Sequence, residues 1–116
     1  MRLLAVLIVL SIVLVQSAQA KTNARIARTK AIICHVFHSY CQQAIQVSSC
    51  ETGGTFDVWA GYGKHDYWGL FQMGSSERRQ YVRGYFWNPW EQSRSAYRYF
   101  INSGRDWGPW SCKPWS

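Results

Sequence analysis

Hydrophobic residues recur at helical spacing in the first half of the chain. They form one stripe over residues 21–37 and a second over residues 40–52, after which Gly53 and Gly54 are placed to end the helix. The stripes consist of Ile26, Ile32, Ile33, Val36 and Phe37, and of Cys41, Ala44, Ile45, Val47 and Ser48. The pattern predicts two consecutive helices, each with one buried face.

Residues 56–73 lack this helical spacing and consist of short aromatic stretches separated by glycines. The stretch "YWGLFQM" within them is compatible with a strand or with an extended loop. Helix is predicted again in "GSSERRQYV", where Ser75 and Ser76 are the candidate N-caps and Glu77 suits the positive helix end. The chain is therefore predicted to be mainly helical, with one short extended segment rich in glycine and aromatic residues.

The stretch "NPWEQSRSAYRYFINSG" gives the clearest helical signal in the chain. Asn88 can cap its start, Pro89 suits the first helical position, and Glu91 stands where a capping-box partner belongs. Gly104 is placed to end the helix. The predicted buried face consists of Ser93, Ala96, Tyr97, Phe100 and Ile101.

The first twenty residues have the layout of a secretory signal peptide. Arg2 supplies the positive start, residues 3–15 form an almost unbroken apolar run, and two small residues precede the expected cleavage site. A membrane anchor is the alternative, but the run is shorter than the about 20 residues that a spanning helix needs. We therefore expect a signal peptide at 1–20, a secreted single domain at 21–116, and no stable membrane insertion after cleavage.

Four cysteines remain after the leader, an even number that predicts two disulfides in an exported protein. The count allows three pairings. We favour Cys34 with Cys41, which closes a local turn, and Cys50 with Cys112, which ties the C-terminal end to the second helix. A metal site is the alternative, because "CHVFHSYC" places two histidines between two cysteines, but this spacing matches no zinc pattern. No metal and no cofactor are therefore expected.

The chain carries a formal net charge of +7, which suits an anionic partner. Because the leader directs the protein out of the cell, a wall polymer or an anionic surface is a better candidate than nucleic acid. A basic surface without any partner is the plain alternative. Seven tryptophans and seven tyrosines exceed what so small a core can absorb, so some rings are expected to line a groove and stack on sugars.

Glu51, the first acidic residue of the chain, falls on the apolar face of the predicted second helix, three residues after Ser48. Burial penalises the carboxylate there, and the negative end of the helix dipole adds to the penalty, so the pKa of Glu51 should rise. A carboxyl that is still protonated near neutral pH is what a general acid requires. The alternative is a structural ion pair with Arg94 or Arg98.

Three stretches in a fixed order are similar to the lysozyme-like superfamily. They are "CETGG" at a helix end, "YWGLFQMGSSER", and "NPWEQSRSAYRYFINSGRDWGPWSC". Together they resemble the bacterial soluble-lytic-transglycosylase type and the small secreted resuscitation-promoting-factor-like proteins, over residues 32–113. The resemblance implies a mainly α, lysozyme-like α+β fold. It also implies cleavage of the β-1,4 bond between N-acetylmuramic acid and N-acetylglucosamine in peptidoglycan glycan strands.

The resemblance assigns Glu51 as the catalytic acid and base, which would form a 1,6-anhydromuramyl product without consuming water. Gln72 matches the substrate-contacting glutamine, Gly69 would allow close approach of the sugar, and Thr52 stands where serine is usual. A tyrosine of the last helix also matches, whereas bulky residues before Gly69 replace small ones and leave the shape of the groove open. The expected substrate-binding residues are Thr52, Tyr67, Trp68, Gly69, Gln72, Tyr97 and Tyr99.

Two other functions remain open from the sequence. A hydrolytic lysozyme usually needs a second carboxylate, and Asp66, beside His65, is the better candidate in the loop region. A non-catalytic, cationic wall-binding protein would use the positive charge and the aromatic excess, including Trp59 and Tyr62, which are expected near the groove. Nothing in the sequence requires more than a monomer.

Overall fold

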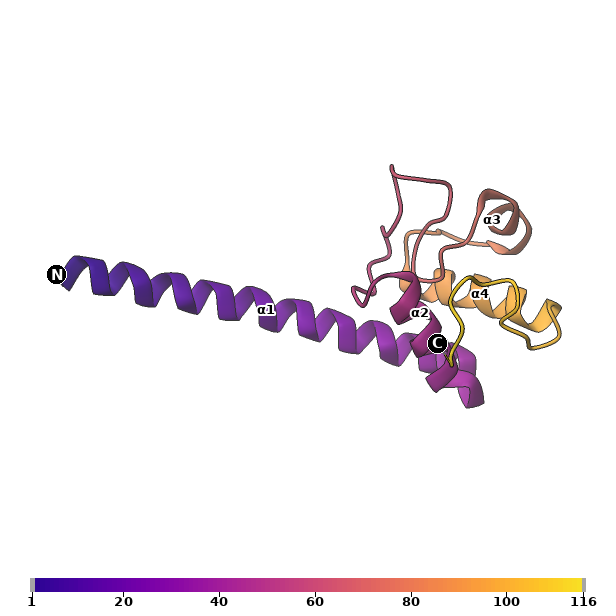
Figure 1. The fold of residues 1–116 in the computed structure, drawn as a ribbon, viewed down its shortest axis with the longest axis horizontal. Coiled ribbons are helices and arrows are strands. Elements are labelled where there is room, and N and C mark those ends of the chain that lie inside the picture. Colours follow the sequence, from indigo (N-terminus) through magenta and orange to yellow (C-terminus); the bar gives the residue numbers. More distant parts are fainter. Residues whose placement is uncertain (1, 116) are drawn as a thin grey trace.

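A long N-terminal helix dominates the computed structural model, which describes residues 2–115. It projects as a rod from a rounded head in which the other helices gather (Figure 1). The helices are α1 (Arg2–Phe37), the short 3-10 helix η1 (His38–Tyr40), α2 (Cys41–Glu51), α3 (Ser75–Tyr81) and α4 (Pro89–Asn102). The described chain is therefore mainly helical, as the hydrophobic pattern predicts.

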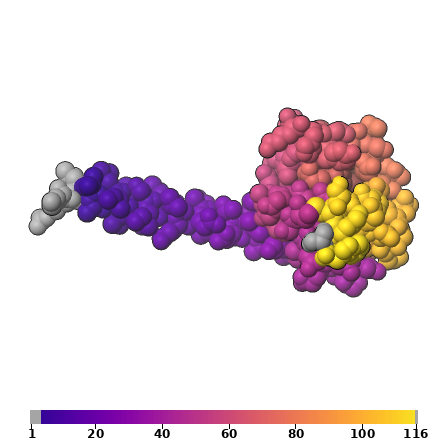
Figure 2. All heavy atoms as spheres, viewed as in Figure 1, coloured from indigo at the N-terminus to yellow at the C-terminus, as the bar shows by residue number. Residues whose placement is uncertain are grey.

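The two halves of α1 have different surroundings. Residues 4–24 are exposed and form a stalk outside the head (Figure 2). By length and composition this helix could cross a membrane, so the short apolar run does not by itself argue against an anchor; a signal sequence near the N-terminus has the same properties. Packing begins at Arg25, whose guanidinium donates to the carbonyls of Phe56 and Thr55 at 2.7 and 2.8 Å. The hydrophobic core and both disulfides therefore lie in the chain from residue 21 onwards.

Phe37, the last residue of α1, stands at the centre of the hydrophobic core. Its ring contacts those of Phe71, Phe100 and Trp107 at centroid distances of 5.4, 5.9 and 5.6 Å. Burial of each such side chain contributes about 1.5–3 kcal/mol, so these rings hold the helices together. The residues of the predicted helix faces that are buried are Ile32, Ile33, Val36, Phe37, Ala44, Val47, Ser48, Ser93, Ala96 and Phe100.

A sharp turn at His38 separates α1 from α2. His38 has a φ of 51°, in the left-handed region, and the disulfide between Cys34 and Cys41 bridges the turn. The second disulfide joins Cys50 to Cys112. The favoured pairing of the four cysteines is therefore confirmed over the other two.

The region between α2 and α3 is a folded loop. It contains an isolated antiparallel bridge in which the backbones of Trp68 and Met73 exchange hydrogen bonds of 3.2 and 3.1 Å. Gly69 and Gln72 turn the chain inside this bridge, with φ values of 84° and 45°. The "YWGLFQM" stretch is therefore a tight turn, and residues 2–115 contain no strand that would supply the β part of the expected α+β fold.

The start of α4 follows the predicted capping only in part. Asn88 caps the helix, because its Oδ1 accepts a hydrogen bond from the backbone N–H of Trp90 at 2.8 Å. Glu91 is not a capping-box partner, which corrects the prediction. Its Oε1 instead accepts from the backbone N–H of Arg83 and from the guanidinium of Arg98, at 2.8 and 2.9 Å.

The start of α3 is capped by a residue from the preceding loop. The N-cap is Gly74, so the predicted caps Ser75 and Ser76 are wrong. Asp66 instead accepts the backbone N–H of Ser75 at 3.0 Å and pairs with Arg78 at 3.1 Å. A carboxylate nine residues away thus replaces the local hydroxyl that the sequence pattern predicts.

Candidate active site

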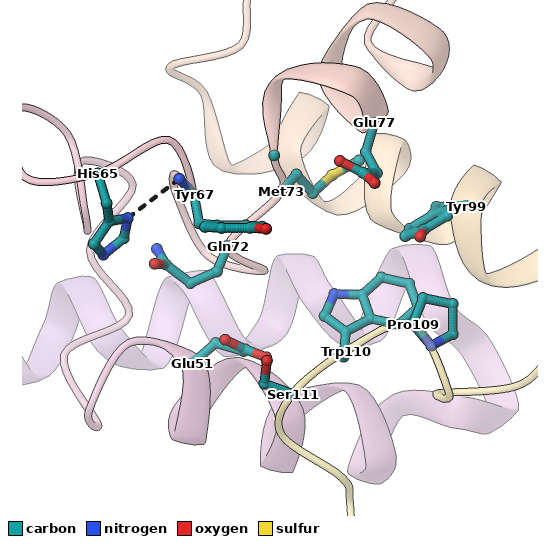
Figure 3. A pocket seen from close by; sticks show the side chains of 11 residues that line it. Glu51, His65, Tyr67, Gln72, Met73, Glu77, Tyr99, Pro109, Trp110 and Ser111 are labelled. Carbon is teal, nitrogen blue, oxygen red and sulfur yellow. Dashed lines mark hydrogen bonds between the residues drawn. The ribbon is translucent and has the colours of Figure 1, made fainter.

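A pocket of about 250 Å³ opens at the C-terminal end of α2. Figure 3 shows side chains converging on it from α2, from the loop before α3, from α3 and α4, and from the C-terminal segment. The polar side chains with ionisable or amide groups in its lining are Glu51, His65, Tyr67, Gln72, Glu77 and Tyr99. Segments that are distant in the sequence therefore meet around Glu51.

Glu51 occupies the last turn of α2 because the chain reverses immediately after it. Gly53 and Gly54 have φ values of 61° and 82°, and the N–H of Gly54 donates to the carbonyl of Ser49 at 2.7 Å. This is the glycine-terminated helix end that the sequence predicts. The apolar side of α2 is thereby kept up to its last residue, which leaves the Glu51 side chain half-buried in the pocket.

The pKa of the Glu51 carboxyl is raised, mainly because burial penalises its charged form. Two nearby groups oppose this effect without cancelling it. The backbone N–H of Cys112 donates to Glu51 Oε1 at 3.1 Å, and the positive charge of Lys113 also favours the carboxylate. The direction of the shift is the one that the sequence predicts.

The arginines considered as ion-pair partners of Glu51 are engaged elsewhere. Arg98 pairs with Glu91 at 2.9 Å, and the guanidinium of Arg94 lies 5.3 Å from the ring centre of Trp90. Burial alone would raise the pKa of Glu91, but the hydrogen bonds from the backbone of Arg83 and from Arg98 outweigh it and lower that pKa. The expected alternative for Glu51, pairing with Arg94 or Arg98, is therefore wrong.

Gln72 and Tyr67, both expected at the substrate, line the same pocket as Glu51. The Gln72 amide donates to the carbonyls of Ala60 and Gly69 at 2.9 and 3.0 Å, which holds the loop in shape. The backbone N–H of Tyr67 donates to Nδ1 of His65 at 3.2 Å, the contact drawn as a dashed line in Figure 3. The loop wall is thus rigidified by its own polar groups.

Tyr99 and Glu77 form the opposite side of the pocket (Figure 3). Burial raises the pKa of the Tyr99 hydroxyl, and the negative charge of Glu77 raises it further. Of the two tyrosines expected from the last helix, only Tyr99 lines this pocket. Tyr97 packs against Phe37, at a ring distance of 5.2 Å, and belongs to the core boundary.

Thr52 and Gly69 serve the fold around the site. The hydroxyl of buried Thr52 donates to the carbonyl of Ser48 at 2.8 Å and accepts the N–H of Phe56 at 3.0 Å. A Cβ on Gly69 would come within 2.4 Å of the Gln92 side chain, so this glycine leaves room for Gln92. Neither residue lines the pocket, so their contact with a sugar stays a prediction.

Trp68 belongs to an aromatic cluster outside the pocket. The guanidinium of Arg78 lies 3.6 Å from the ring centre of Trp68, and the ring of Tyr62 lies 5.2 Å from it. Trp59 stacks on Trp87 at 4.1 Å in the same cluster. Trp59 and Tyr62 remain about half exposed, at 47% and 55%, so the cluster forms an aromatic surface next to the site.

Asp66, the expected second carboxylate of a hydrolase, does not line the pocket. The hydrogen bonds from Ser75 and the pairing with Arg78 lower its pKa, so it is an exposed, ionised cap of α3. Glu77 is the acidic residue that joins Glu51 in the pocket. The sequence pattern indicates Glu77 only as a favourable residue at the start of a helix, because local spacing does not show which loop it faces.

Gln92 is a further residue that the helical pattern does not reveal. Its buried amide accepts the N–H of Leu70 at 2.8 Å and donates to the carbonyl of Val58 at 2.9 Å. It therefore ties α4 to both ends of the loop. Trp110 in the C-terminal segment is buried in the core and also lines the pocket.

No family model, no curated protein and no solved structure matches this chain.

Proposed function

We propose that the protein is a secreted, peptidoglycan-cleaving lytic transglycosylase of the lysozyme-like type. In this proposal Glu51 is the general acid and base, and residues 1–20 are a signal peptide. The observation that carries the proposal is a half-buried carboxyl with a raised pKa in a pocket that also contains Gln72 and Tyr99. The apolar N-terminal helix and the two disulfides fit export to an oxidising environment.

The proposed reaction uses Glu51 twice. The protonated carboxyl first donates its proton to the glycosidic oxygen, so that the bond from C1 of N-acetylmuramic acid to the N-acetylglucosamine oxygen breaks. The resulting carboxylate then accepts the proton of the muramyl 6-hydroxyl as O6 bonds to C1, which gives the 1,6-anhydro product. General acid catalysis of this kind contributes about 10²–10⁴ in rate.

A hydrolytic lysozyme is the second candidate, and the position of Glu77 is what favours it. Glu77 lines the pocket on the side opposite Glu51 and is a candidate to activate a water molecule or stabilise the transition state. Asp66 is the weaker candidate for that role, because its carboxylate is taken up by Ser75 and Arg78.

A cationic wall-binding protein is the third candidate, and it is favoured by the aromatic surface. A groove of about 350 Å³ beside the cluster is lined by Trp68, Phe86 and Trp87 together with Arg78 and Arg79. Aromatic rings and arginines suit a glycan with anionic substituents. Such binding would not need the raised pKa of Glu51.

Product analysis separates the three candidates. The 21–116 chain, Glu51→Gln, Glu77→Gln and, as a matched control, Asp66→Asn are incubated with purified peptidoglycan, and the soluble fragments are examined by mass spectrometry. We expect anhydromuramyl ends from all proteins except Glu51→Gln. Reducing ends, one water heavier and lost in Glu77→Gln, would establish the hydrolase. Absence of fragments, with the protein retained on the wall, would favour the binding function.

A further inference from the structure

The two oxygens of the Glu51 carboxyl have different surroundings. Oε1 accepts the backbone N–H of Cys112 at 3.1 Å. Within residues 2–115, Oε2 accepts no hydrogen bond. The carboxyl is therefore held at one oxygen, and the other is left for a ligand in the pocket.

The segment that supplies this N–H is fixed independently of Glu51. The disulfide joins Cys112 to Cys50, the residue immediately before Glu51. The indole N–H of buried Trp110 donates to the carbonyl of Phe71 at 3.0 Å, which fastens the segment to the loop wall. The donor is thus pre-positioned by a covalent bond on one side and by a buried hydrogen bond on the other.

Lys113 closes the same segment into a compact turn. Its ammonium donates to the carbonyls of Trp107 and Gly108 at 3.0 and 2.9 Å, and also to the carbonyl of Trp110. Three backbone acceptors converging on one cation leave little freedom to the chain on either side of Cys112.

We propose that Cys112 is a positioning residue for Glu51, whose backbone N–H occupies Oε1 and so places the acid proton on Oε2. This inference rests on the proposed function, in which Glu51 is the general acid. A protonated carboxyl carries its proton on one oxygen, and an oxygen that accepts an N–H keeps its lone pair for that bond. The proton is therefore delivered from one defined atom, Oε2.

The N–H of Cys112 and the charge of Lys113 both lower the pKa of Glu51 against the larger effect of burial. They limit how far the pKa rises, so that the same carboxyl can release its proton to the leaving group and later act as a base. Removing the N–H should raise the pKa of Glu51 further. The other titratable groups that line the pocket are His65, Tyr67, Glu77 and Tyr99.

The backbone N–H can be removed without losing the disulfide. Residues 21–49 are ligated at the Ser49–Cys50 junction to a synthetic peptide of residues 50–116, in which an ester replaces the amide between Ser111 and Cys112. The all-amide ligation product is the parent, and an ester at exposed Trp115 is the matched control. The carboxyl of ¹³C-labelled Glu51 is titrated by NMR, and peptidoglycan cleavage is measured as a function of pH.

We expect the Cys112 ester to raise the midpoint of the Glu51 titration and to lower kcat by on the order of 10², with KM unchanged. The Trp115 ester should change neither quantity. An unchanged Glu51 titration in the Cys112 ester would overturn the inference. If no ligated protein cleaves peptidoglycan, the proposed function fails, while the titration still decides whether Cys112 controls the carboxyl.

Discussion

Gln92 offers the sharpest test of how the site is held together. Gln92→Leu keeps the volume of the side chain but removes two hydrogen bonds, to the N–H of Leu70 and to the carbonyl of Val58. The Leu70 N–H is buried, and an unsatisfied buried donor costs about 1–3 kcal/mol. The Val58 carbonyl is partly buried and can gain water, so the combined loss should be about 3 kcal/mol. The total free energy of unfolding of a small domain is about 5–15 kcal/mol, so this loss would be easy to measure.

The assay is urea unfolding of the 21–116 chain, followed by tryptophan fluorescence. Gln80→Leu, at an exposed position on α3, is the control and should change the stability by less than about 0.5 kcal/mol. A loss below about 1 kcal/mol for Gln92→Leu would refute the reasoning, because it would mean that the loop does not depend on this amide.

Three further predictions follow from Glu51 and the disulfides. Because burial raises the pKa of Glu51, the rate of peptidoglycan cleavage should fall as pH rises through that pKa. A cleavage rate that stays unchanged up to about pH 9 would contradict this prediction. The folded state binds this proton more tightly than the unfolded state, so stability should fall as pH rises from about 4.3 through the folded pKa. Glu51→Gln should therefore have a higher Tm than the parent at pH 7, with a gap that closes below about pH 4. By loop entropy, replacing Cys50 and Cys112 with alanine should cost about 4 kcal/mol, against about 2 kcal/mol for Cys34 and Cys41, and equal losses in urea unfolding would exclude that account.

Helices and cross-links could be predicted because they depend on short-range patterns. The stripe that ends at Phe37 and the glycines after Glu51 specify buried faces and a helix end through local geometry alone. The disulfide pairs follow from the same helices, since one pair closes a turn and the other joins the chain end to α2. Within the candidate site, Gln72, Tyr67 and Tyr99 lie with Glu51 in one pocket.

The polar contacts could not be predicted because their partners come from distant segments. Asp66 caps α3 in place of a serine, and Glu91 binds Arg98 and the backbone of Arg83 in place of its own helix start. Gln92 reads as part of a polar helix face, yet it is buried because its partners lie 22 and 34 residues away. Sequence spacing describes neighbours on one helix, and it carries no information about which loop packs over that helix.

Glu51, whose ionisation destabilises the fold, lies in the same small region as the Cys50–Cys112 disulfide. A half-buried Glu51 that ionises destabilises the fold, and the loop beside it contains no strand within the described residues. The Cys50–Cys112 disulfide, the Gln92 amide and the Trp110 indole all fasten walls of that pocket. A carboxyl serving only the fold could be replaced by glutamine with a gain in stability at neutral pH. A carboxyl with a raised pKa in a pocket fastened by a disulfide is the arrangement that the proposed general acid would need.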